Sequence, residues 1–164
     1  MMAPAPERSW MIHRLLDESL IIPDLHAADR EGALREMVRF LCVRDRRYSG
    51  KDLYEKLLSR ERLGSTAVGD GYAIPHCKIK GLDDPVVLLA VSRKGVAFEA
   101  INKRPVHGFL LVVTPDENPN LSLEILAAAA LLIRRSGSLL KKMRKAASSG
   151  ELLALVRDAE VRPG

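Results

Sequence analysis

Two short apolar runs, residues 86–91 and 106–113, lie between segments whose apolar residues follow helical spacing. Neither run alternates with polar residues, and turn-forming residues bound both of them. Such runs are typical of strands that a sheet buries on both faces. The pattern therefore predicts an α/β protein in which helices surround one sheet. Residues 20–22 are a candidate for a strand or turn, and residues 72–74 for a further short strand.

Two helices are expected before these runs. Asp29 can cap the first, because apolar residues then recur at intervals of three and four over residues 33–42. The second helix is expected to follow residues 49–50 and to end near Gly64. Together they form a helical hairpin. The residues on the buried side of the second helix are expected to be Leu53, Tyr54, Leu57 and Leu58.

Three further helices are expected after the second run. Asn118 offers an N-cap and Pro119 a first helical position, and the helix they open is almost wholly apolar up to residues 136–137. Because so few of its residues are polar, we expect this helix to be central. Residues 138–147 and 151–159 give two closing helices, and Ser148 with Glu151 matches a capping box.

The length of 164 residues favours a single domain. We expect residues 1–8 to be a flexible lead-in and residues 9–164 to form the domain. Two cysteines cannot build a disulfide framework, and no signal peptide opens the chain, so a cytoplasmic location is predicted. The longest apolar stretch, residues 121–133, is shorter than a membrane span and contains polar residues. Membrane insertion is therefore not expected.

The net charge of +5 is largely local. The contributing cations are Arg134, Arg135, Lys141, Lys142, Arg144 and Lys145. With 4% aromatic residues the chain has little with which to stack bases, so we do not expect it to bind nucleic acid. Two interpretations of this stretch stay open, a solvated helix face and a docking surface for an acidic protein.

The segment most informative about chemistry is residues 60–78, which read RERLGSTAVGDGYAIPHCK. Its glycines, with Ser65 and Thr66, predict a flexible loop rich in small hydrogen-bond donors. Backbone amides in such turns can bind phosphate oxygens, and arginine can hold the same oxygens through two parallel bonds. Glycines alone are weak evidence for an anion site, because ordinary turns use them as well.

His76 ends this loop and is the candidate nucleophile. Neutral imidazole is a good nucleophile for phosphoryl transfer, and Pro75 restricts the backbone just before it. We expect the other histidines, His13, His26 and His107, to be structural. A thiol nucleophile at Cys77 is a weaker alternative, because adjacent residues on a strand point to opposite faces. No cluster has the spacing of a metal site, so neither a metal nor a cofactor is expected.

The same segment resembles the signature of the fructose/mannitol-type enzyme IIA domain of the bacterial phosphotransferase system. That family includes the nitrogen-regulatory enzyme IIA proteins. The shared elements are an arginine–glutamate pair, a G-S-T turn, a glycine-framed loop and A-I-P-H, which ends in the phosphorylated histidine. The resemblance extends over residues 20–159. It implies a single mixed β-sheet flanked by helices and a phosphotransferase component with a phosphohistidine intermediate.

By this resemblance, His76 receives a phosphoryl group from the histidine phosphocarrier protein, and Arg60 neutralises the arriving charge. Thr66 and the loop amides supply donors to the equatorial oxygens. The phosphoryl group then passes to a IIB component or serves as a signal to a regulatory target, the branch we prefer. Outside the resemblance, Arg60 is interpreted as a surface residue closing its helix, and Thr66 as a turn hydroxyl.

Two positions depart from the family pattern. Ser122 stands where these domains usually carry a second active-site histidine, and Asn102 stands where an acid is often found. Serine can donate one hydrogen bond to phosphate but carries no positive charge. This departure supports a second hypothesis, a binding module of the same fold that has lost efficient phosphotransfer. The sequence predicts neither a sugar, nor a regulatory target, nor an oligomeric state.

Overall fold

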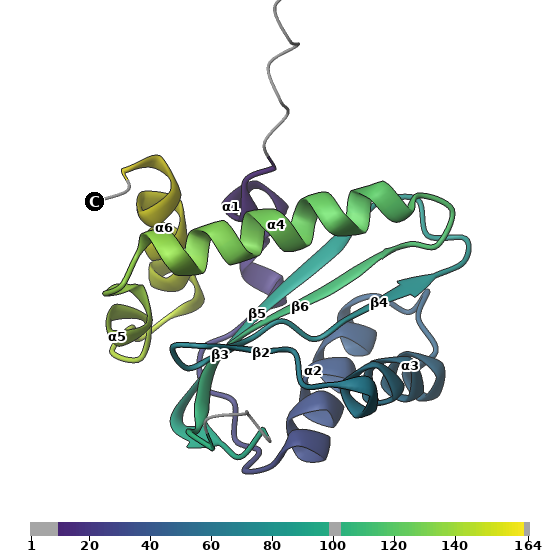
Figure 1. Cartoon of the computed structure of the whole chain (residues 1–164), viewed down its shortest axis with the longest axis horizontal. Coiled ribbons are helices and arrows are strands. Elements are labelled where there is room, and N and C mark those ends of the chain that lie inside the picture. Colours follow the sequence, from purple (N-terminus) through teal and green to yellow (C-terminus); the bar gives the residue numbers. More distant parts are fainter. Residues whose placement is uncertain (1–9, 99–102, 163–164) are drawn as a thin grey trace, which may run out of the picture.

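The two apolar runs form the longest strands in the described part of the chain, β5 (Val86–Val96) and β6 (Val106–Pro115), which pair antiparallel. The computed structural model describes residues 10–98 and 103–162. The expected lead-in at residues 1–8 and Asn102 lie outside these residues. Within them, one mixed six-stranded sheet confirms the predicted fold class (Figure 1).

The remaining strands are short and join the central pair from both sides. On one side, β1 (Ile21–Ile22) runs parallel to β5. On the other, β3 (Tyr72–Ala73) and β4 (His76–Ile79) both run parallel to β6, and β2 (Ala67–Gly69) pairs antiparallel with β3. The strands expected near residues 20–22 and 72–74 are therefore confirmed.

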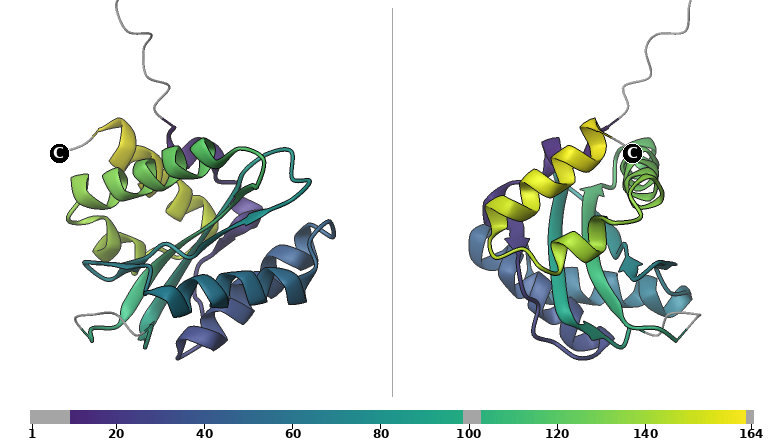
Figure 2. Two further views of the ribbon diagram at one scale, coloured as in Figure 1. Left: turned by 45° about the vertical axis from the view of Figure 1, so that its right-hand side comes forward. Right: turned by 90° about the vertical axis from the view of Figure 1, so that its left-hand side faces the viewer.

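Helices cover both faces of the sheet. Below it in Figure 1 lies the hairpin of α2 (Arg30–Arg44) and α3 (Gly50–Leu63), and above it lies α4 (Pro119–Arg135). The face of the sheet that α4 covers is also covered by α1 (Ile12–Leu15), α5 (Leu139–Met143) and α6 (Ser149–Val161). Figure 2 shows the sheet separating these two groups of helices. A 3-10 turn, η1 (Glu18–Leu20), leads into β1.

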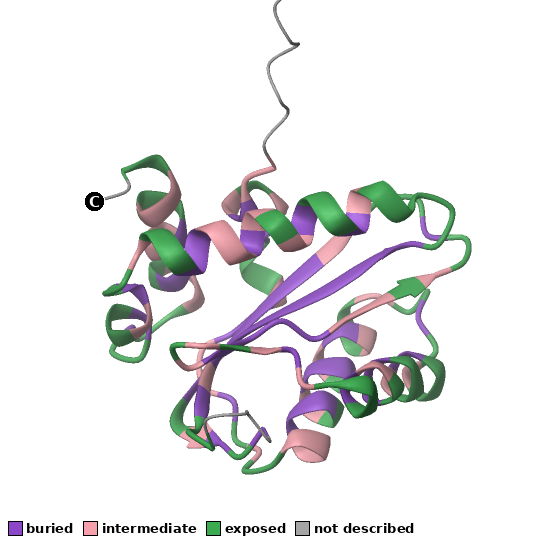
Figure 3. Cartoon of the chain, in the orientation of Figure 1, coloured by how far each residue is buried: buried purple, intermediate pink, exposed green. Residues whose placement is uncertain are grey.

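The side chains of the central strands divide between two cores. Along β6, Phe109 and Leu111 pack into the core between the sheet and α2 and α3, which we call the core under α2 and α3. Leu110 and Val112 pack into the core between the sheet and α4, which we call the core under α4. This alternation follows from the period of two along a strand. Because both sides are covered, β5 and β6 carry apolar residues on both faces, and their inner parts are buried in Figure 3.

The predicted helix starts are confirmed by their capping bonds. The side chain of Asp29 accepts from the N–H of Gly32 at 2.8 Å, and Asn118 accepts from Leu121 before a helix that begins with Pro119. Ser49 and Ser148 cap α3 and α6 in the same way. The capping box at α6 is modified, because Glu151 accepts from the N–H of Ala147, not from that of Ser148.

Two expectations about helices were wrong. The apolar helix α4 is not central, because one of its faces is exposed and Leu123 is 68% accessible. Alanines make much of its apolar surface, and their short side chains are tolerated in water. The helix expected over residues 138–147 is only the short α5. No helix in the described ranges has both the length and the apolarity needed to span a bilayer.

Candidate functional site: a histidine pinned beside the central strand

His76 is the first residue of β4 and pairs with Val112 of β6. Paired residues of neighbouring strands point to the same face, as do residues two apart along an extended chain. Val112 and Ile74 both belong to the core under α4, so the imidazole of His76 lies on that face. Cys77 points to the opposite face and packs against the core under α2 and α3.

The imidazole ring of His76 is held in one tautomer. Its Nδ1 lies 2.7 Å from the carbonyl oxygen of Ile74. A carbonyl only accepts, so Nδ1 carries the ring proton of the neutral imidazole and the free lone pair is on Nε2. Nε2 has no hydrogen-bond partner among the described residues, and it is not one of their fully buried polar atoms. The nitrogen that holds the free lone pair therefore keeps some exposed surface.

Burial lowers the pKa of His76 below its ordinary value of 6.5. The hydrogen bond to Ile74 acts in the opposite direction, and the positive charges of Arg60 and Lys78 add to the lowering. Desolvation and nearby cations both disfavour a charged imidazolium. His76 is consequently neutral at pH 7, which is the form that can attack phosphorus.

A buried carboxylate holds the backbone behind this histidine. Glu61, in the last turn of α3, is 2% exposed and accepts from the N–H of Thr66 at 2.9 Å and from its hydroxyl. The carbonyl of Thr66 in turn accepts from the N–H of Ile74 at 3.1 Å. A continuous set of hydrogen bonds therefore runs from Glu61 through Thr66 and Ile74 to His76.

Thr66 and Arg60 both have structural contacts of their own. The hydroxyl proton of Thr66 is used by Glu61, and its side chain is buried. The Nη1 atom of Arg60 donates to the carbonyl of Gly64 at 2.9 Å, where α3 ends. Arg60 thus closes its helix as one interpretation expected, while its positive charge also acts on the pKa of His76.

The flexible glycine loop expected before His76 is not observed. Residues 67–73 form the β2–β3 hairpin instead. Asp70 and Gly71 occupy its turn with φ of 54° and 85°, the left-handed values that a type I′ turn requires. Gly71 accepts from the N–H groups of His107 and Gly108. Gly108 precedes Val112 by four strand residues, about 13 Å, so the turn lies away from His76.

Ser122 lies on the helix that covers the histidine's face of the sheet. It is the fourth residue of α4 and is 4% exposed. The hydrogen bonds of the described residues include none between Ser122 and His76. The structure therefore links His76, Arg60 and Thr66 through α3 and the hairpin, and it presents Ser122 from a separate element.

The other candidate residues have other surroundings. Nδ1 of His13 lies 2.7 Å from Glu160, and Nδ1 of His107 lies 2.8 Å from the carbonyl of Ser92, as expected of structural histidines. His26 is exposed. Burial raises the pKa of Cys77 to about 12, so its thiol stays protonated and is a poor nucleophile. Within the described ranges, no three metal-ligating side chains converge.

The basic stretch of residues 134–145 lies at the end of α4 and along α5, and all six of its cations are exposed. The guanidinium of Arg144 donates to the carbonyl of Arg93 at 3.0 Å. This arrangement agrees with a solvated helix face.

The sequence did not single out Glu61 as a buried anchor. One signal was available, because a carboxylate in the last turn of a helix opposes the helix dipole. Such a residue usually needs compensation, and here Thr66 provides two donors. The burial of Glu61 could not be predicted from α3 alone, because the β2–β3 hairpin determines which side of the last turn faces inward.

Comparisons with known proteins identify the family and the fold of the chain. The model of the family "Phosphoenolpyruvate-dependent sugar phosphotransferase system, EIIA 2" matches residues 14–159. A nitrogen regulatory protein from Bradyrhizobium diazoefficiens is 33% identical over 133 residues, 79% of this chain and 84% of the relative. The crystal structure of nitrogen regulatory protein IIA-Ntr from Neisseria meningitidis is 27% identical, with a TM-score of 0.79 over 88% of this chain and 98% of that chain.

A third match shares the fold. The mannitol enzyme IIA of Escherichia coli, solved in complex with phosphorylated enzyme IIB, is 18% identical with a TM-score of 0.68. The alignment covers 87% of this chain and 96% of that one.

Proposed function

Because this chain belongs to the phosphotransferase system EIIA 2 family, we propose that it is a phosphoryl carrier whose acceptor atom is Nε2 of His76. The donor is the histidine phosphocarrier protein. The observation that carries the proposal is the tautomer of His76, because its Nδ1 proton is engaged by Ile74 while Nε2 is accessible and unpaired among the described residues.

The transfer needs no proton movement at the acceptor nitrogen. The Nε2 lone pair forms a bond to phosphorus as the bond between phosphorus and the donor's imidazole nitrogen breaks, and the donor nitrogen keeps that electron pair. The proton of Nδ1 stays on its nitrogen throughout, hydrogen-bonded to Ile74. Phosphoryl transfer requires mainly in-line positioning and charge stabilisation, which a fixed ring favours.

Arg60 supplies positive charge to the incoming phosphoryl group. Its guanidinium has further donors besides the one that closes α3 at Gly64. Burial is the main cause of the lowered pKa of His76, and the charge of Arg60, which adds to that lowering, also stabilises the phosphoryl oxygens. Glu61 and Thr66 act as positioning residues, since they hold the backbone that fixes the ring.

We assign the output of this phosphorylation to regulation in the cytoplasm. Relatives of this chain are nitrogen regulatory proteins. A phosphoryl group adds a charge of about −2 at the accessible edge of the imidazole and changes the field that a target protein meets. Transfer to a IIB component is the other route, supported by the enzyme IIB complex of the mannitol relative.

The acceptor is tested by incubating the protein with phosphoenolpyruvate, enzyme I and the phosphocarrier protein. We expect an acid-labile phosphoryl adduct on the wild type and on His26→Gln, a matched change at an exposed histidine, and none on His76→Gln. A family member labelled in parallel verifies the donor proteins. If that control is labelled and the wild type is not, the carrier function is excluded.

A second candidate function is a binding module of the same fold without phosphotransfer. The observation that favours it is Ser122, a serine that is 4% exposed and stands where the family usually has an imidazole. Pull-downs with His76→Ala and His76→Asp distinguish the two functions. Partner binding that differs between these variants supports a phosphorylation switch, and equal binding supports the module.

A further inference from the structure

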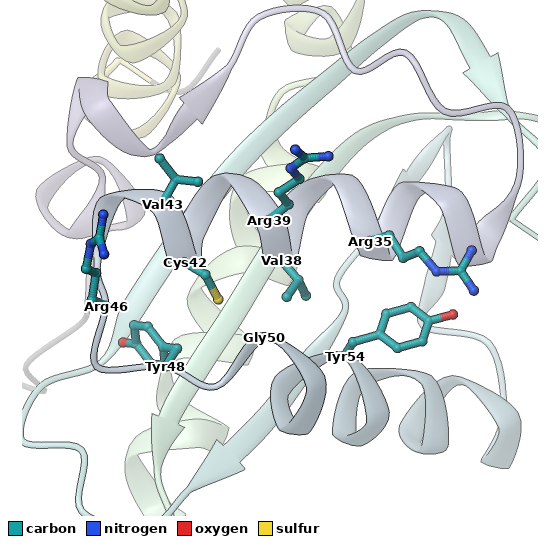
Figure 4. A pocket seen from close by; sticks show the side chains of 9 residues that line it. All are labelled: Arg35, Val38, Arg39, Cys42, Val43, Arg46, Tyr48, Gly50 and Tyr54. Carbon is teal, nitrogen blue, oxygen red and sulfur yellow. The ribbon is translucent and has the colours of Figure 1, made fainter.

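A groove between α2 and α3 lies apart from the histidine site (Figure 4). Its volume is about 680 Å³, within the range of small-molecule sites. The groove is lined by the first half of α3, whereas Arg60 and Glu61 lie in the last turn of that helix. The six-residue step from Tyr54 to Arg60 corresponds to about 9 Å along the helix, which separates the groove from the histidine site. The lining residues are Arg35, Val38, Arg39, Cys42, Val43, Arg46, Tyr48, Gly50 and Tyr54.

Three arginines give the groove a positive rim. Arg35, Arg39 and Arg46 are exposed, and no ion pair within the described residues involves them. The neighbouring carboxylate of Asp45 is already held by the guanidinium of Arg47, at 2.7 Å from Nη2. In Figure 4, Arg39 points away from α3 and Arg46 lies beyond the end of α2, while Arg35 reaches toward Tyr54. The distance from the guanidinium of Arg35 to the Tyr54 ring is 5.0 Å.

The wall between these cations is apolar. Val43, which is 68% exposed, is one of few large aliphatic side chains that the described surface leaves open to water. Val38 and Cys42 point from α2 toward α3 in Figure 4. A Cβ at Gly50 would make ordinary van der Waals contact with the sulfur of Cys42, at 3.7 Å. An apolar ligand body therefore has a surface to cover.

Tyr48 closes the end of the groove next to Arg46. Tyr48 is 9% exposed, and its buried hydroxyl forms no hydrogen bond among the described residues. Burial raises the pKa of Tyr48 to about 12, so the phenol keeps its proton and remains a donor. Because this hydroxyl has no exposed surface, Tyr48 contributes its ring, not its oxygen, to the wall of the groove.

Phosphate suits this combination, because guanidinium groups bind it through paired hydrogen bonds and its double negative charge complements a rim of several cations. We propose that the groove between α2 and α3 binds a small organic phosphate, with its phosphate on the arginine rim and its apolar body against Val43 and Tyr54. Nothing in this step requires His76 to be phosphorylated, so the site is independent of the proposed carrier function.

The proposal is tested by isothermal titration calorimetry on the full, unphosphorylated chain at low salt. The probes are adenosine 5′-diphosphate, which has an extended body, and inorganic phosphate alone. We expect the nucleotide to bind at least tenfold more tightly than phosphate. The double variant Arg39→Gln/Arg46→Gln should weaken nucleotide binding at least tenfold. The matched control, Arg134→Gln/Arg135→Gln, removes the same charge from the end of α4 and should bind as the wild type does.

Four results would overturn the proposal. They are no nucleotide binding at millimolar concentration, equal affinity for nucleotide and inorganic phosphate, equal loss in the two double variants, and binding of an acidic peptide without nucleotide. The last result would identify the groove as a protein-docking face. A labelled His76 without nucleotide binding excludes only the groove site, and nucleotide binding without a labelled His76 excludes only the carrier function.

Discussion

The carboxylate of Glu61, in the last turn of α3, accepts hydrogen bonds from both the backbone N–H and the hydroxyl of Thr66, which immediately precedes β2. This pair joins the last turn of α3 to the hairpin, and the carbonyl of Thr66 then holds Ile74. The carbonyl that fixes the tautomer of His76 is therefore set by a helix on the opposite face of the sheet. Phosphoryl acceptance and the stability of α3 should consequently change together.

Glu61→Ala should destabilise the protein and slow phosphorylation of His76. It leaves the buried N–H and hydroxyl of Thr66 without an acceptor, which costs about 2–4 kcal/mol of unfolding free energy. The exposed Glu55 of the same helix serves as the control, and Glu55→Ala should cost less than about 0.5 kcal/mol. Chemical denaturation measures both variants. Equal stability of the two would show that the Glu61–Thr66 contact is not stabilising.

Thr66→Val separates a structural hydroxyl from one that binds phosphate. Because the hydroxyl donates to Glu61, its removal should cost about 1–2 kcal/mol in the unphosphorylated protein, whereas Thr66→Ser should retain most of that stability. Denaturant titration gives the free energies, and the labelling assay gives the rates. A Thr66→Val variant with wild-type stability but much slower labelling would show that the hydroxyl serves the phosphoryl group instead.

The rate of phosphorylation should fall at acid pH with a midpoint below 6.5. Burial lowers the pKa of His76, so Nε2 keeps its lone pair at pH 7 and loses it only when the pH falls below that lowered pKa. NMR titration of the His76 ring and labelling rates between pH 4.5 and 8 should report the same midpoint. A midpoint above 6.5 in both measurements would contradict the burial of the ring.

The same shift predicts a contribution to stability. The unfolded chain binds the proton at a pKa of about 6.5, above that of the folded state, so unfolding takes up protons in between. The contribution of His76 is therefore present above pH 6.5 and is lost as the pH falls through the folded-state pKa. His76→Gln should remove this part of the pH dependence of the unfolding free energy, and an unchanged pH dependence would contradict it.

Local chemistry explains why most of the fold was predictable. Asp29 and Asn118 identify helix starts because capping depends on one side chain and the next three residues. The runs in β5 and β6 indicate a covered sheet, because short continuous apolar runs between turn-forming residues are typical of strands buried on both faces. The hairpin turn at Asp70 and Gly71 was also predictable, since Asp-Gly favours a type I′ turn, but its glycines were assigned to a flexible loop that could hold an anion.

Features that depend on long-range packing were not predictable in the same way. The burial of Glu61 requires the hairpin to fold back over the end of α3, and no pattern within α3 shows this. The exposure of one face of α4 likewise depends on how many layers cover the sheet, because alanine occurs on both buried and exposed helix faces. The groove between α2 and α3 arises from two helices whose separate sequences read as ordinary amphipathic segments.

Ser122→His should increase the rate at which phosphorylated His76 passes its phosphoryl group to a IIB component. The helix α4 covers the face on which His76 lies, and an imidazole there adds a donor that can carry positive charge, which serine lacks. Ser122 is 4% exposed, so the larger ring should cost about 1–3 kcal/mol of stability through overpacking.

Single-turnover transfer measures the rate, and Ser122→Gln controls for size and hydrogen bonding without a titratable ring. We expect a gain of tenfold or more for histidine alone. An equal gain for glutamine would attribute the effect to hydrogen bonding, and no gain for either would remove Ser122 from the account of phosphoryl transfer.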